Sequence, residues 1–240
     1  MSNAVIPRQQ GDDFQAKYFW YKACKLFLQD TTAIRVAWEI SEIPGFDDVS
    51  IYFEPGVLDK LTGKAISSKF YQVKFHVDHT EFFTCEALTK PEFIGNKNES
   101  ILQRLNKNYK EKPEIFANSL YYIVNTWSLN PTDTLKELIN NEHAIILTRL
   151  FDGTTTDTSK MGKIRKMWRE HLGITSDDEL KEVLSRLRIV HNAKASELFT
   201  DDLNVRLQLA GFQPISEIKR TSPYTGLIQQ LHSEKRNTFT

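Results

Sequence analysis

The chain has 240 residues, of which 40% are hydrophobic and 26% are charged, a length that can bury either one large domain or a core with a helical annex. Its 31 lysines and arginines balance its 31 aspartates and glutamates, so contact with nucleic acid would have to come from local basic patches. No signal peptide or bilayer-length apolar run is present, and Cys24 and Cys85 follow no disulfide pattern, which predicts a cytoplasmic protein that makes no membrane contact.

The first predicted element is an amphipathic helix over residues 13–29. At the helical period its apolar side chains share one sector and its polar side chains share the other. The apolar sector consists of Phe19, Trp20, Ala23, Leu26 and Phe27. A helix with such a stripe is expected to pack on a sheet.

Two strands are predicted next. Residues 34–40 form the first, with Glu39 at its end, and an acidic turn then leads into the second over residues 46–53. In the second strand Val49, Ile51 and Phe53 share one face, which leaves Asp48 on the other. A polar hairpin connection over residues 55–68 predicts that this strand and the following one are antiparallel neighbours.

The central predicted strand covers residues 69–75 and is rich in aromatic and β-branched residues. Because side chains alternate along a strand, Gln72 and Lys74 share the face opposite Tyr71 and Val73. An acid followed on a neighbouring strand by glutamine-any-lysine is a nuclease pattern. The carboxylate and the amide oxygen can bind a divalent metal, and the lysine can steady the attacking water and the charged phosphorane.

A short polar cluster follows this strand. His76 and His79, with Cys85 and Glu86 further along, can be interpreted as a zinc site or as polar residues leaving a strand beside an active site. The second interpretation is favoured, because the paired ligand spacings of structural zinc sites are missing.

Later segments alternate between strand and helix. Residues 119–127 and 144–150 are predicted as strands, with a helix from Asn130 to Asn140 between them. Everything after the loop at 152–159 is predicted to be helical, including a helix capped by Ser176 and another over residues 200–210 that Gly211 closes. The chain therefore divides into residues 1–150, a core with a mixed sheet of about five strands, and residues 151–240, a helical subdomain.

Two of the helical segments are basic. The first begins at Asn98 and runs to Tyr109, and it carries Lys107. The second contains a run without acids, formed by Lys160, Lys163, Arg165, Lys166 and Arg169. Each is either an ordinary solvated face or a surface that contacts backbone phosphates.

Together these motifs resemble the PD-(D/E)xK, restriction-endonuclease-like superfamily in its Gln-x-Lys variant. More narrowly, the stretches 11–15, 47–49 and 71–74 are similar to the endonuclease domain of the CD-NTase-associated protein 4 family, effectors of CBASS anti-phage defence. The motif likeness covers residues 8–125, and it is looser in the helical remainder. In that family a nucleotide-sensing SAVED domain follows the nuclease. No segment of that size is present, so the chain is expected to be an effector domain separated from a SAVED-like sensor.

The resemblance implies an α/β, restriction-endonuclease-like fold and hydrolysis of phosphodiester bonds in double-stranded DNA with Mg²⁺ or Mn²⁺. Asp48 and Gln72 would be the metal ligands and Lys74 the catalytic cation. Glu39 is either an additional acid of the site or a solvated strand end, and Gln15 faces either the catalytic groove or solvent. Since each chain carries one candidate site and a duplex has two strands, we expect a homo-oligomer on activation.

Three classes of function remain open. The chain is a metal-dependent DNA endonuclease, a nucleic-acid-binding module that keeps the fold without catalysis, or a protein-interaction module whose helical half carries the function. The presence of Asp48, Gln72 and Lys74 together favours the endonuclease.

Overall fold

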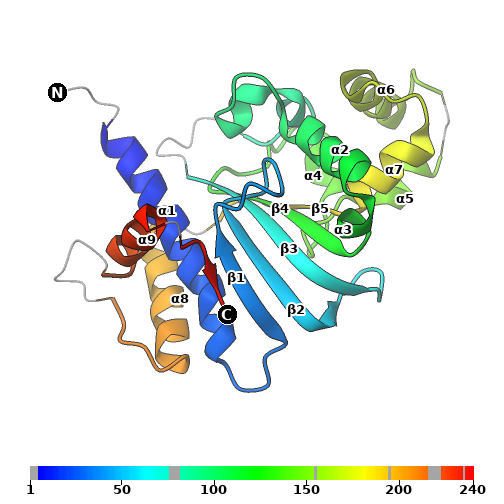
Figure 1. Ribbon diagram of the computed structural model, residues 1–240. Coiled ribbons are helices and arrows are strands. Elements are labelled where there is room, and N and C mark those ends of the chain that lie inside the picture. The colour runs from blue at the N-terminus through cyan, green and yellow to red at the C-terminus, as the bar shows by residue number, and fades with distance from the viewer. Residues whose placement is uncertain (1–4, 76–81, 154–155, 194–195, 216–222, 235) are drawn as a thin grey trace.

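The computed structural model describes residues 5–75, 82–153, 156–193, 196–215, 223–234 and 236–240. A six-stranded mixed sheet lies between two layers of helices (Figure 1), in the strand order β5-β4-β3-β2-β1-β6. The strands are β1 Ala33–Trp38, β2 Val49–Leu58, β3 Ala65–Lys74, β4 Ser119–Asn125, β5 Leu187–Val190 and β6 Thr238–Phe239. The predicted α/β class, a mixed sheet flanked by helices, is confirmed.

Pairing within the sheet follows the connections. Strands β2 and β3 are antiparallel neighbours, as the short polar connection between residues 55 and 68 predicted, and β1 pairs antiparallel with β2. Strand β4 lies parallel to β3, and β5 parallel to β4, because helical crossovers join each pair. Strand β6 pairs antiparallel with β1 through Val36 and Ala37.

The predicted strand at 144–150 is wrong. Ala144 makes only an isolated bridge with Arg188, and Leu147–Phe151 forms helix α5, whose Leu150 is fully buried. Short apolar runs cannot be assigned to strand or buried helix by periodicity alone. The fifth strand is instead β5, in the region expected to be entirely helical.

Two helix starts that were predicted from an N-cap asparagine were misplaced. Helix α2, Ile101–Glu111, is capped by Ser100 rather than Asn98, because Ser100 and Gln103 form a reciprocal capping box. The helix expected from Asn130 to Asn140 shortens to α4, Leu135–Leu138. Before it, the Asn130 side chain accepts from the N–H of Thr132 and Asp133 accepts from that of Leu135, which favours turns over helix.

Side-chain alternation divides the core into two layers. Phe70 and Ile123 point to one face of the sheet, called here the α2 face, whereas Tyr71 and Val124 point to the other, the α1 face. The α2 face is covered by α2, α3 Pro113–Ala117, α4, α5, α6 Lys160–Leu172 and α7 Asp177–Ser185, with the short helices η2 Ala87–Thr89 and η3 Pro91–Ile94. The α1 face is covered by α1 Val5–Ala23, η1 Cys24–Phe27, α8 Ser196–Leu209 and α9 Pro223–Ser233.

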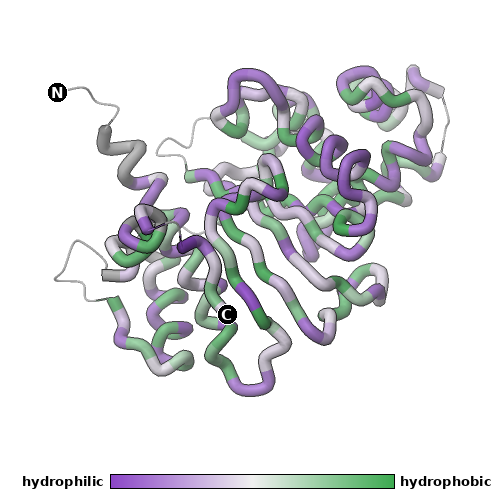
Figure 2. The backbone as a smooth tube through the Cα atoms, viewed as in Figure 1, coloured by the Kyte–Doolittle hydropathy of each residue, from purple (hydrophilic) through white to green (hydrophobic). Residues whose placement is uncertain are grey.

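Both halves of the sequence build the sheet and its cores. Strands β5 and β6 come from beyond residue 150, and Leu184 of α7 and Leu203 of α8 are buried in the two layers. Hydrophilic residues are frequent on the outer helices α2 and α6 (Figure 2). In the part of the chain that the structure describes, no helix combines the length and the apolar character needed to cross a membrane.

Candidate functional site

The candidate site forms where the β2–β3 ladder ends. The last pair of this ladder joins Val49 and Tyr71, so the main chain of Val73 extends past it. Two side chains take the place of a strand there. Asp48 Oδ2 accepts a hydrogen bond from the Val73 N–H at 2.6 Å, and Gln15 Nε2 of helix α1 donates to the Val73 carbonyl at 2.9 Å.

Three predicted site residues meet at this point. Besides the Val73 N–H, Asp48 Oδ2 accepts from Gln72 Nε2 and, at 3.4 Å, from Gln15 Nε2. Gln72 is only 2% exposed, which is unusual for a glutamine and is explained by its bond to the carboxylate. The structure therefore brings together Gln15 of α1, Asp48, which directly precedes β2, and Gln72 of β3.

The environment of Asp48 makes its ionised form less favourable than it would be in water. Burial raises the pKa of Asp48 to about 6, and the neighbouring Asp47 charge adds to the rise. The Lys74 ammonium, the Val73 N–H and the Gln72 amide oppose the shift without cancelling it. The site is thus short of positive charge around an ionised Asp48, a condition that a bound cation would relieve.

Lys74 is the last residue of β3, where it is half-buried and pairs in register with Asn125 of β4. The strand period places it on the same side as Gln72, and its charge acts on Asp48. Lys74 is therefore close enough to influence the ionisation of this carboxylate.

Glu39 contacts Asp48 through main-chain atoms. Its N–H donates to the Asp48 carbonyl at 3.4 Å, and its side chain is exposed on a residue with a φ of 46°. The described residues include no group of three acidic, histidine or cysteine side chains placed to hold a metal. The assignment of Glu39 as an additional acid stays a prediction.

The donor set suits a hard divalent cation rather than zinc. Asp48 offers carboxylate oxygens and the Gln72 amide carries one oxygen besides the Nε2 that donates to Asp48, and these are the oxygen ligands that a hard cation prefers. Mg²⁺ commonly binds through one or two such groups and keeps several waters, so two side chains are sufficient. The residues at this position therefore fit Mg²⁺ or Mn²⁺.

The predicted phosphate-binding residues are not gathered here. Lys107 is half-buried on α2, and Lys163 and Lys166 are exposed on α6, which lies across the molecule from α1 (Figure 1). Arg165 requires a correction, because its side chain is 2% exposed. Its Nε pairs with Asp177 at 2.9 Å and its NH1 donates to the Leu150 carbonyl at 2.6 Å. It supports the packing of α6 and cannot contact DNA in this arrangement.

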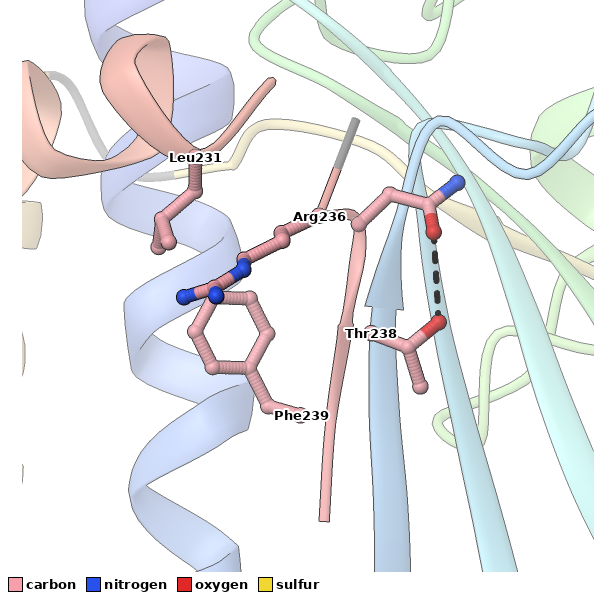
Figure 3. A pocket seen from close by; sticks show the side chains of 5 residues that line it. Leu231, Arg236, Thr238 and Phe239 are labelled. Carbon is pink, nitrogen blue, oxygen red and sulfur yellow. Dashed lines mark hydrogen bonds between the residues drawn. The ribbon is translucent and has the colours of Figure 1, made fainter. Parts of the chain in front are cut away.

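Two further features lie apart from the site. His76 and His79, considered above as zinc ligands, fall outside the described residues. A pocket near the end of the chain is lined by Leu231, Arg236, Asn237, Thr238 and Phe239 (Figure 3). None of Asp48, Gln72 and Lys74 lines it, so its location does not coincide with the predicted chemistry.

The main chain of Val73 is a part of the site that sequence reasoning missed. Main-chain groups carry no residue-type signal, and their availability depends on where strand pairing stops. The one sequence indication is the acidic turn before β2, because a turn there ends the ladder before Val73.

Comparison with known proteins gives one informative relative. No family model matches the chain. It is 36% identical, over 243 aligned residues that include 100% of the chain, to the CD-NTase-associated protein 4 of Enterobacter hormaechei subsp. hoffmannii (strain UCI 50). The alignment covers 47% of that protein, so the chain spans about half the length of the curated relative that it matches.

Proposed function

We propose that this chain is a metal-dependent DNA endonuclease module of an anti-phage defence effector. The convergence of Asp48 and Gln72 at the end of the β2–β3 ladder, beside Lys74, carries the proposal. The similarity of the whole chain to about half of a CD-NTase-associated protein supports the assignment to CBASS defence.

Each side chain has a distinct role in this proposal. Asp48 and Gln72 hold Mg²⁺ or Mn²⁺, which when bound neutralises charge on the phosphate and acidifies a water. Lys74 orients the attacking water and stabilises the extra negative charge that develops on the phosphoryl oxygens. Gln15 fixes the Val73 carbonyl and thereby holds β3 against α1, which keeps Asp48 and Gln72 in register.

A sensor domain is the first partner that we propose, on the basis of the greater length of the relative. Because the chain corresponds to about half of that protein, we propose that the remainder of the longer protein is a sensor, of the SAVED type implied by the resemblance. Binding of a nucleotide signal there would bring copies of the nuclease module together on double-stranded DNA. Cytoplasmic location is part of the same proposal.

Replacement of Lys74 by alanine provides the direct test. A positioned charge that acts in the transition state is worth about 3–4 kcal/mol, so cleavage in Mg²⁺ should fall by roughly a hundred- to a thousandfold. Affinity for a DNA duplex, measured in Ca²⁺ to suppress turnover, should stay near the wild-type value, because the same charge contributes little to ground-state binding.

Lys64→Ala is the matched control, since Lys64 is an exposed lysine just before the same strand. It should cleave at the wild-type rate, and thermal melting should show that both variants are folded. Near-normal cleavage by Lys74→Ala would remove the nuclease assignment. DNA binding without cleavage by any preparation would point to the non-catalytic binding module instead.

A further inference from the structure

One face of helix α1 continues away from the candidate site. Gln15, Tyr18, Lys22 and Lys25 are spaced so that they share this face, which extends from α1 into η1. Gln15 lies at the end that contacts Val73, and Lys25 lies about 15 Å further along at the helical rise. The face thus leads directly from the proposed metal ligands.

Aromatic rings hold Lys22 at the middle of this face. Its Nζ lies 4.7 Å from the Tyr18 ring centroid, 5.4 Å from that of Tyr21 and 4.6 Å from that of Tyr71. Arg206 of α8 lies over the Tyr21 ring, with its Cζ 4.2 Å from the ring centroid. Ring faces attract cations, so these contacts fix the positions of Lys22 and Arg206 beside each other.

Three elements contribute cations to the same area. Burial is the main reason that the pKa of Lys22 is low. The charges of Lys25 in η1, Lys69 in β3 and Arg206 in α8 lower it further, so these cations lie near Lys22. Burial and, after it, the Arg206 charge lower the pKa of Lys25, and burial and the Lys25 charge lower the pKa of Lys69. We name Lys22, Lys25, Lys69 and Arg206 the α1 basic cluster.

Within the described part of the chain, few acidic side chains act on this cluster. The carboxylate that acts on Lys69 is Asp59, and Arg188 already engages both of its oxygens at 3.1 Å. Among the described residues, no ion pair joins a member of the cluster to an acid. By contrast, on α6 Lys160 pairs with Glu137 and Lys166 with Glu170. Because the cations of the cluster repel one another, a bound polyanion would lower their electrostatic energy.

We propose that the α1 basic cluster binds the phosphate backbone of a DNA strand that runs from the Asp48 site along helix α1. Measured along the duplex axis, a length of about 15 Å corresponds to about four phosphates of one strand. Lys25, Lys69 and Arg206 make the phosphate contacts beside the ring-bound Lys22. The identity of the anion as substrate DNA rests on the proposed function.

The test compares two triple variants that each lose three positive charges. Lys25→Gln, Lys69→Gln and Arg206→Gln combined removes the contacts but retains Lys22 and its rings. Lys97→Gln, Lys136→Gln and Lys181→Gln combined removes three exposed lysines elsewhere in the chain. Affinity for a duplex oligonucleotide is measured by fluorescence anisotropy in Ca²⁺ over a range of salt concentrations, with melting temperature as the folding check.

The cluster variant should bind more weakly, and the slope of log affinity against log salt should become shallower by about two to three units, while the control keeps the wild-type slope. The double variant Lys25→Gln with Arg206→Gln, which leaves β3 untouched, should give about two-thirds of the effect if the triple variant is unstable. An unchanged slope, an equal change in the control, or absence of DNA binding by the wild type would overturn the proposal. Failure of the nuclease assignment is separate, because it would appear as loss of Mg²⁺-dependent cleavage with this binding intact.

Discussion

Asp48 combines a high pKa with a role that requires its charge. Its pKa of about 6 lies above the value of 3.8 for a free aspartate, because burial penalises the ionised form. A carboxyl of this kind makes folding most favourable below the unfolded pKa, and that stability is lost as the pH rises towards 6. At neutral pH the ionised Asp48 carboxylate therefore destabilises the fold, and it is the form that would bind a metal ion.

Asp48→Asn should be more stable than wild type at pH 7.5, by at most about 3 kcal/mol, because it removes the buried charge but keeps an acceptor for Gln72 and Val73. The gain should shrink as the pH falls from 6 to 4 and disappear below that range. Urea unfolding at several pH values measures it, with Asp12→Asn, an exposed carboxyl on α1, as the control. A stability difference that does not vary with pH would contradict the raised pKa as its cause.

At the scale of elements, a buried ion pair joins strand β5 to the turn after β2. Arg188 NH2 donates to both Asp59 oxygens at 3.1 Å, and the two side chains are 2% and 5% exposed. Arg188 also donates to the Ser185 and Leu187 carbonyls, and Thr62 Oγ1 donates to Asp59 at 2.8 Å. These bonds fix β5, an edge strand of only four residues, against the sheet.

Arg188→Met should therefore destabilise the fold by about 3–5 kcal/mol, because it leaves Asp59 buried without its partner. The double variant Arg188→Met with Asp59→Leu should recover part of that loss. The nearby exposed pair Lys60–Glu142, at 3.4 Å, supplies the control, and Lys60→Met should cost less than about 1 kcal/mol. Chemical denaturation compares the four proteins, and equal losses for the two single variants would show that burial of the pair is unimportant.

At the scale of the whole molecule, one site per chain limits what a single copy can do to a duplex. A monomer should nick supercoiled plasmid, and linear product should accumulate only when two copies meet. The ratio of linear to nicked product should therefore rise with protein concentration, as followed by agarose gel electrophoresis alongside light scattering for molecular mass. Fast double-strand cleavage that is first order in a demonstrated monomer would contradict this expectation.

The sequence by itself determined the parts that depend on local pattern. The antiparallel pairing of β2 and β3 followed from the short connection between them, and the closeness of Asp48 and Gln72 was predicted by assigning them to neighbouring strands, although Asp48 in fact directly precedes β2. Strand alternation also placed Gln72 and Lys74 on one side of β3. In each case chain neighbours become spatial neighbours, so a turn and a period of two are enough to specify the contact.

Only the tertiary structure decided the rest, because it depends on contacts between distant residues. Gln15 reaches Val73 across 58 positions and Arg188 reaches Asp59 across 129, and no local pattern encodes either pairing. Arg165 belongs to a basic run, yet its burial against Leu150 and Asp177 removes it from the surface. The α1 basic cluster forms for the same reason, since packing of α1 and α8 beside β3 joins cations that lie in three separate parts of the chain.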